Sequence, residues 1–91
     1  MAIKIKSIMI FKIILKLHDM EKQGLKPNIS EFLRYTKFRP ETFYKHKAVL
    51  ITLKLIEEEK TSQFPFHTHL KLTEKGRRIA KALKEIEETL F

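Results

Sequence analysis

The chain has 91 residues, enough for one domain with one hydrophobic core, and it carries a net charge of +8. It has no cysteine, which excludes disulfides, thiolate metal sites and cysteine nucleophiles, and its two glycines form no Gly-rich phosphate loop. No nucleophile, base and orienting group occur at a recognisable spacing, so we expect no catalytic residues, no metal and no cofactor. The basic charge attracts polyanions, and nucleic acid, an acidic membrane and an acidic protein all remain as partners.

The first predicted helix runs to about Lys22, with Ser7 as its expected N-cap. Apolar residues recur along it at helical spacing and also on other faces, so we expect it to be buried on more than one side, with a second subunit as part of the cover. The apolar run of residues 8–17 contains two lysines and is about half as long as a bilayer span. No small-residue cleavage site follows it, so we expect a cytoplasmic protein that is not inserted in a membrane. Gly24 and Pro27 end the helix.

Two helices are predicted next, in the most basic part of the chain. Asn28 and Glu31 have the spacing of a capping box and start a short helix that ends near Lys37. Pro40 suits the first turn of a third helix, which begins after Arg39 and ends near residue 53 or 54. The predicted inner face of this helix holds Phe43, His46 or Lys47, Leu50 and Leu53, and the opposite face holds Glu41, Thr42, Tyr44, Lys45 and Ala48. Residues 23–56 contain seven lysines and arginines against two glutamates.

Two short strands follow, at residues 56–60 and 67–72, around a loop that contains Pro65. Thr73 is the expected cap of a last helix from Glu74 to about Leu90. Apolar residues in this helix form a seam of under two heptads, made of Ile79, Leu83, Ile86 and Leu90. The predicted fold is mainly α with a small β-hairpin, in the order helix, helix, helix, strand, strand, helix. This is the order of a winged helix-turn-helix: a single domain over residues 1–91, with the helix-turn-helix at about 28–53, the wing at about 55–72 and the C-terminal helix at about 74–90.

Two passages resemble prokaryotic winged-helix transcription regulators. Residues 39–59, RPETFYKHKAVLITLKLIEEE, resemble the passage from recognition helix to wing, and residues 72–78, LTEKGRR, resemble the step from the wing into the last helix. The resemblance covers about residues 25–80 and is to MarR- and PadR-like groups and to short archaeal and archaeal-virus regulators. Two positions depart from the pattern: Lys54 stands where glycine is usual, and Lys47 stands where an apolar residue is usual. The glutamates at 57–59 put negative charge at the base of the wing, and we expect them to point away from DNA or to lie outside the contact.

The resemblance implies sequence-specific binding of double-stranded DNA by a small transcription regulator. The recognition helix would enter the major groove, and the wing would contact flanking backbone or the minor groove. The residues expected to contact DNA are Arg34, Lys37, Arg39, Thr42, Tyr44, Lys45 and His46 in the helix-turn-helix and Lys60, Ser62 and Gln63 in the wing. A homodimer would place two recognition helices about one DNA turn apart, with its interface on the last-helix seam (Ile79, Leu83, Ile86, Leu90), on the first helix, or on both.

Other interpretations remain open. A winged helix can also be a protein-interaction module within a larger assembly, because fold alone does not fix function. RNA binding is less favoured, since no aromatic-rich sheet motif is present.

Single residues also have more than one interpretation. Tyr44 could pack against the wing, and the basic residues could form ordinary solvated surface. Phe64 and Phe66 either contact a partner or a ligand, or fold back on the core. His67 and His69 have a spacing that can bind metal, but no further ligand completes a site. His18 and His46 are expected to be hydrogen-bonded helix residues rather than pH switches.

Overall fold

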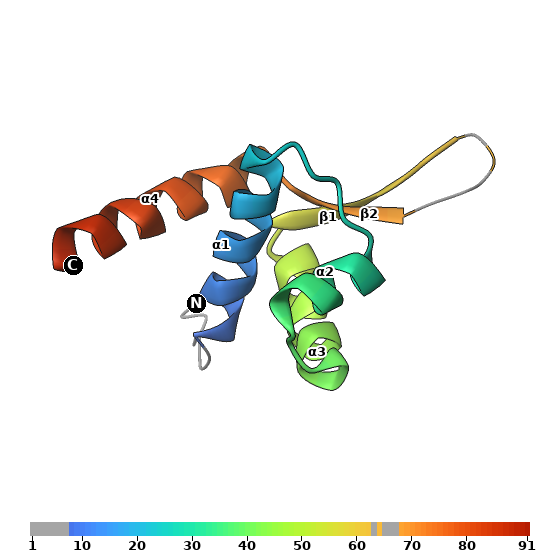
Figure 1. Cartoon of the computed structure of the whole chain (residues 1–91), viewed down its shortest axis with the longest axis horizontal. Coiled ribbons are helices and arrows are strands. Elements are labelled where there is room, and N and C mark those ends of the chain that lie inside the picture. The colour runs from blue at the N-terminus through green and yellow to red at the C-terminus, as the bar shows by residue number, and fades with distance from the viewer. Residues whose placement is uncertain (1–7, 63, 65–67) are drawn as a thin grey trace.

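The computed structural model describes residues 8–62, 64 and 68–91. Its elements, in chain order, are α1 (Met9–Lys22), α2 (Ile29–Thr36), α3 (Pro40–Thr52), β1 (Ile56–Lys60), β2 (Thr68–Leu72) and α4 (Glu74–Leu90). The described residues thus form four helices and an antiparallel hairpin, and Figure 1 shows the hairpin projecting from the helical body, so the predicted winged-helix order is confirmed. The expected cap Ser7 lies outside the described residues, and the N-cap position of α1 is Ile8, which makes no side-chain capping hydrogen bond.

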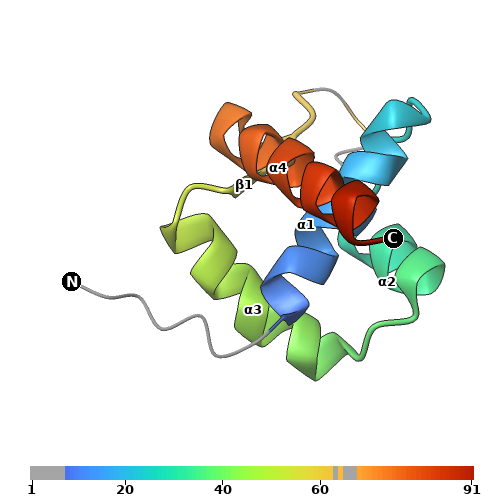
Figure 2. The same ribbon diagram turned by 90° about the vertical axis from the view of Figure 1, so that its left-hand side faces the viewer.

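Helix α1 lies at the centre of the core. Ile13, Ile14 and Leu17 are almost fully buried, and α4, β2 and α3 all contact the helix. Figure 2 shows α4 lying across α1. The buried residues of α1 lie along one broad face that α4, β2 and α3 cover, whereas Phe11 and Leu15 on another face are only partly buried, and cover by a second subunit stays a prediction. Each such side chain contributes about 1.5–3 kcal/mol when buried, which makes α1 the main source of the core's stability.

The helix-turn-helix is held by a cap at one end and by aromatic packing in the middle. The capping box is present: the backbone N–H of Glu31 donates to Asn28 Oδ1 (2.8 Å), and that of Asn28 donates to Glu31 Oε1 (3.0 Å). Phe32 of α2 and Phe43 of α3 are fully buried, with ring centroids 5.3 Å apart. Aromatic pairs at this separation contribute about 0.5–1.5 kcal/mol beyond their buried area, so this contact fixes α3 against α2.

The contacts between α4 and the chain that links α3 to β1 explain why residues 72–76 have the sequence LTEKG. Thr73 caps α4 by accepting a hydrogen bond from the backbone N–H of Gly76 (3.0 Å), and its hydroxyl donates to the backbone oxygen of Lys54 (2.6 Å). The backbone N–H of Thr73 donates to the oxygen of Leu55 (3.1 Å). Gly76 lies so close to that same Leu55 oxygen that a Cβ atom would collide with it. The glycine is therefore required by the close approach of α4 to the chain between α3 and β1.

Lys54 adopts the left-handed backbone conformation that the missing glycine would have supplied. Its φ is +59°, a value that favours glycine because a Cβ crowds the following carbonyl. The helix α3 thus ends at the expected place and in the usual geometry, but with a residue for which that geometry is unfavourable.

The hairpin pairs Ile56 with Leu72 and Glu58 with Leu70. Ile56, Leu70 and Leu72 are buried, whereas Glu57–Lys60 are exposed, so one side of the wing base belongs to the core. Strand β2 is also tied to the loop between α1 and α2, because the backbone N–H of Leu70 donates to the oxygen of Pro27 (2.8 Å). The predicted strand start at residue 67 lies outside the described residues.

Candidate nucleic-acid interface

Helix α3 has one solvent-exposed face, which lies opposite its buried side. Phe43 and Leu50 are buried on its inner side. Directly opposite, at spacings of four, three and four, lie Glu41, Lys45, Ala48 and Thr52, and all four are exposed. In an α-helix residues at these spacings share one face, so this outward line is the part of α3 that a groove can receive. Lys45 was predicted as a DNA contact, whereas Thr52 was not, although the helical period places it on the same line.

Thr42 and His46 lie on the flank of α3 rather than on the outward line. Both are partly buried. The Nδ1 of His46 lies 2.7 Å from the backbone oxygen of Thr42, and because a carbonyl only accepts, the ring donates here. His46 is therefore a hydrogen-bonded helix residue, as predicted, and its contact with DNA stays a prediction.

Lys47 joins α3 to the wing, and the Tyr44 ring lies beside it on the same helix. The Tyr44 ring is half-exposed and meets Phe43 edge-on, and Lys47 Nζ lies 5.4 Å from the ring centroid. Lys47 Nζ also forms an ion pair with Glu58 Oε1 of β1 (2.7 Å). The lysine that replaces the usual apolar residue thus bridges α3 and the first wing strand, β1.

Two of the three wing glutamates are neutralised within the chain. Glu58 pairs with Lys47, and Glu59 pairs with Lys71 across the hairpin (3.3 Å). Glu57 is exposed. The negative charge at the wing base is therefore partly balanced, because two of its three carboxylates have lysine partners.

The remaining predicted contact residues lie in the turn, on α2 and in the wing. Arg34, Lys37 and Arg39 are exposed; Arg39 is the N-cap residue of α3, and Lys37 ends α2 with a left-handed φ of +61°. Lys60 and Ser62 are exposed at the end of β1 and just beyond it. Gln63 lies outside the described residues, as does Phe66, whereas Phe64 is 86% exposed and so does not fold back on the core.

The sequence of this domain was compared with known families. Residues 2–90 match the family described as ArnR1-like, winged-helix domain. The chain belongs to this family. A comparison with curated proteins found no match. The predicted membership of a winged-helix regulator family is thereby confirmed at the level of the fold.

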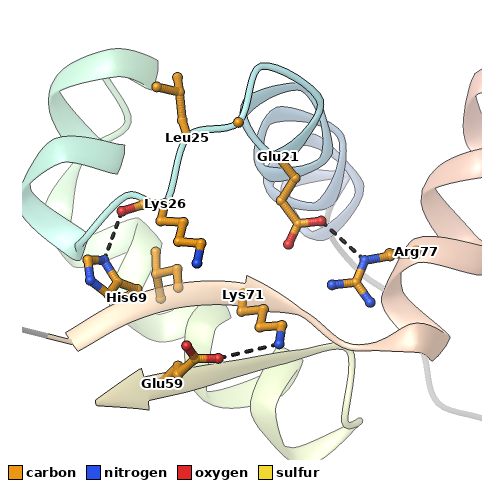
Figure 3. A pocket seen from close by; sticks show the side chains of 9 residues that line it. Glu21, Leu25, Lys26, Glu59, His69, Lys71 and Arg77 are labelled. Carbon is orange, nitrogen blue, oxygen red and sulfur yellow. Dashed lines mark hydrogen bonds and ion pairs between the residues drawn. The ribbon is translucent and has the colours of Figure 1, made fainter. Parts of the chain in front are cut away.

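In this ArnR1-like domain, the wing is anchored by a residue that sequence reasoning missed. Glu21, near the end of α1, accepts a hydrogen bond from the backbone N–H of Leu72 through Oε1 (3.0 Å) and pairs with Arg77 Nε through Oε2 (3.3 Å). Figure 3 shows Glu21 reaching toward Arg77 above β2, with His69 donating to the backbone oxygen of Lys26 at the other side of the hollow. One carboxylate therefore connects α1, the second wing strand and α4.

The surface around Glu21 is hollowed. The hollow has a volume of about 300 Å³ and is lined by Glu21, Gly24, Leu25, Lys26, Glu59, His69, Leu70, Lys71 and Arg77. Within it, Arg77 is paired with Glu21 and Lys71 with Glu59. Glu21 thus holds the second wing strand against α1 and α4, and the Lys71–Glu59 pair joins the two strands of the wing.

His18 is buried in α1, and its Nδ1 has no hydrogen-bond partner among the described residues. The prediction of a hydrogen-bonded residue is therefore wrong for this atom. Burial lowers the pKa of His18 below its usual value, because the charged ring would lose its hydration. Nearby charges act in both directions: the lysines lower the pKa and the carboxylates raise it, the groups being Lys22, Asp19, Glu21 and Lys81.

In the ArnR1-like domain, only half of the predicted apolar seam of α4 is in contact with the core. Ile79 and Leu83 pack against the core of the same chain, whereas Ile86 and Leu90 are exposed. Across the described part of the chain, no group of three or more His, Asp or Glu residues is placed to hold a metal ion. None of the described helices combines the length and the apolar character needed to cross a bilayer.

Proposed function

We propose that the chain is a transcription regulator that binds double-stranded DNA in a sequence-specific manner. The observation that carries this proposal is the outward line of α3, formed by Glu41, Lys45, Ala48 and Thr52 on a helix whose other side is fixed in the core. A B-DNA major groove accepts one α-helix, and this line is what the helix would present to base edges. The family and the resemblance to MarR- and PadR-like and archaeal regulators support the same function.

The chemistry of each position suits a different part of the duplex. Arg39, at the N-terminus of α3, can fork onto a guanine edge or clamp a phosphate. Lys45 can contact a phosphate or a base, and the methyl groups of Ala48 and Thr52 suit thymine methyls. Arg34, in the last turn of α2, and Lys37, at its C-cap, are exposed and would contact phosphates, as the first helix of such motifs does. The wing would reach flanking backbone or the minor groove with Lys60, Ser62 and Gln63.

Binding to random and selected duplexes tests the proposal. Each phosphate contact releases counterions, so the logarithm of the affinity falls with the logarithm of salt concentration by about 0.9 per contact. We expect measurable binding at low salt and a steep loss at high salt, followed in random-duplex selection by enrichment of one sequence. Absence of binding to any duplex at low salt would overturn the proposal.

A triple variant tests where the DNA lies. Arg39→Ala, Lys45→Ala and Lys37→Ala together should remove most of the affinity, because all three are exposed on or beside α3. A matched control replaces three exposed cations of α1, Lys12, Lys16 and Lys22, by alanine and should leave most of the affinity intact. If the α3 variant bound DNA as tightly as the unaltered chain, a protein-interaction module would replace the proposed function.

We also propose that the protein acts in the cytoplasm as a homodimer. Two-fold symmetry would let two recognition helices meet two half-sites about one DNA turn apart, and a near-palindromic selected site is the expected result.

A further inference from the structure

Helix α4 uses only its first part to hold the domain together. Gly76 and Ala80 are buried, and Ile79 and Leu83 pack against the core. Lys84 then pairs with Asp19 of α1 (3.5 Å). From residue 85 to the end of the chain every residue is exposed, and Figure 1 shows this end of α4 extending beyond the other elements.

The extending end is apolar on one side. Ile86 is 55% exposed, Leu90 70% and Phe91 100%. An open hollow of about 360 Å³ runs along this side, lined by Ala82, Glu85, Ile86, Thr89 and Leu90. The small side chain of Ala82 leaves room at one end of the hollow, and the larger apolar side chains stand at the other end.

The charges of α4 are divided between its two halves. Residues 74–82 carry four cations and one anion, whereas residues 83–91 carry three anions and one cation. Two parallel copies of this helix would set acidic half against acidic half. Two antiparallel copies would set the basic half of each against the acidic half of the other, and would bring cations to the negative C-terminal end of the partner's helix dipole.

We infer that a second copy of this chain occupies this face, with the two α4 helices antiparallel and Ile86 of each copy seated beside Ala82 of the other. In this register Lys81 of one copy faces the acidic stretch of the other, and Arg78 lies near Leu90 at the other copy's C-terminal end. The inference deepens the proposed function, because it specifies how the regulator dimerises. The contact involves part of a 17-residue helix and is smaller than a standard interface of about 800 Å² per partner, so the free dimer is weak and concentration-dependent. Two adjacent half-sites on DNA would hold two copies close together, and the higher local concentration of the chain would strengthen the dimer.

Sedimentation of the full chain tests the interface. We expect a shift from monomer to dimer as the protein concentration rises. Ile86→Asp should weaken dimerisation about tenfold or more, because it places a charge in the apolar contact. Its thermal unfolding midpoint, measured where the chain is monomeric, should match that of the unaltered monomer, since Ile86 is largely exposed in the monomer.

Ile8→Asp is the matched control. Ile8 is 67% exposed and precedes α1, so the same change there should leave the dimer intact. A chain that stays monomeric at every concentration, or an Ile86→Asp variant that dimerises as well as the control, would overturn the inference.

Single cysteines test the orientation, because the chain has no cysteine of its own. In the antiparallel register residue 78 of one copy lies opposite residue 90 of the other, while the two copies of residue 90 are twelve positions apart, about 18 Å along the helix. A short thiol crosslinker should therefore join Arg78→Cys chains to Leu90→Cys chains in a mixture, and should join Leu90→Cys chains to each other poorly. Efficient crosslinking of Leu90→Cys chains to each other would show parallel pairing and overturn the inference.

DNA binding separates this inference from the function on which it rests. If the chain is monomeric but binds selected duplexes, the dimer is wrong and the DNA-binding function stands. If the chain dimerises as described but binds no duplex, the interface stands and the DNA-binding function fails.

Discussion

The hydroxyl of Thr73 donates to the backbone oxygen of Lys54 across 2.6 Å, so that the residue which caps α4 also closes the end of α3. The same oxygen atom of Thr73 accepts the backbone N–H of Gly76. Lys75 adds a second link, since its Nζ donates to the backbone oxygen of Leu53 (3.0 Å). The backbone oxygens of the two residues that follow α3 are thus bonded by the N-cap and the first turn of α4, so this junction leaves neither of them without a donor.

Removing the Thr73 hydroxyl should destabilise two helices at once. We expect Thr73→Ala to lower the free energy of unfolding by about 1–3 kcal/mol, combining the loss of an N-cap with the loss of one further hydrogen bond. Thr73→Ser keeps the hydroxyl and should retain most of the stability. Urea unfolding of the two variants measures the difference, and equal stabilities would show that the hydroxyl does not link the helices.

Two lysines with left-handed backbone provide a pair of contrasting substitutions. Lys54→Gly should stabilise the fold by up to about 1 kcal/mol, because glycine adopts the φ of +59° without steric strain. Lys37→Gly, at a φ of +61°, should stabilise to a similar extent.

The Lys37→Gly and Lys54→Gly variants should differ in their affinity for DNA. Lys37 is exposed next to the turn into α3, whereas Lys54 lies beyond the end of that helix. Lys37→Gly should therefore weaken DNA binding and reduce its salt dependence, while Lys54→Gly should not. An equal loss of affinity in both variants would contradict the assigned position of the duplex.

Glu21 should matter more to stability than its place on a helix surface indicates. Glu21→Ala removes the acceptor of the Leu72 N–H and the partner of Arg77, and should cost about 1–3 kcal/mol in chemical unfolding. Glu21→Gln keeps one acceptor oxygen and should cost less. Glu88→Ala, at an exposed position on α4, is the control and should change stability by no more than about 0.5 kcal/mol.

Stability should fall when the pH is lowered past the ordinary pKa of histidine, partly because of His18. Its pKa in the folded protein lies below the ordinary histidine value of 6.5, since burial disfavours the charged ring. As the pH falls through 6.5, the unfolded chain takes up this proton before the folded chain does, so the free energy of unfolding decreases until the folded pKa is reached. Urea unfolding between neutral and mildly acidic pH should show this decrease in the unaltered chain.

A histidine variant and a control without a titratable group isolate this effect. His18→Gln should have a flatter pH profile over the same range, whereas Ser62→Ala, at an exposed position, should keep the profile of the unaltered chain. If the His18→Gln and unaltered profiles were parallel, His18 would not be the source of the dependence.

The features that the sequence predicted correctly depend on residues close together in the chain. The capping box joins Asn28 to Glu31 and the last cap joins Thr73 to Gly76, each pair only three positions apart, and Pro40 acts at the single position where α3 begins. Helical periodicity likewise identified Phe43 and Leu50 as core residues. The same periodicity was sufficient to place Thr52 beside Lys45 on the outward line.

The features that were missed depend on contacts between distant residues. The partners of Glu21 are Leu72 and Arg77, which lie 51 and 56 positions after it in the chain, and no pattern around Glu21 indicates them. The role of Lys47 depends on Glu58, eleven positions away and on another element. The α4 seam is periodic along its whole length, but only the crossing with α1 decides that Ile79 and Leu83 are partly buried while Ile86 and Leu90 remain exposed.

The ion pair between Lys47 and Glu58 joins the helix that would enter the major groove to the strand that leads to the wing. The two elements are therefore oriented relative to each other before any ligand arrives. A protein whose contact elements are already ordered loses less conformational entropy on association. On encountering a duplex, this domain would need to adjust mainly the side chains at its surface, so its preference among sequences would depend on how well each duplex fits a preorganised shape.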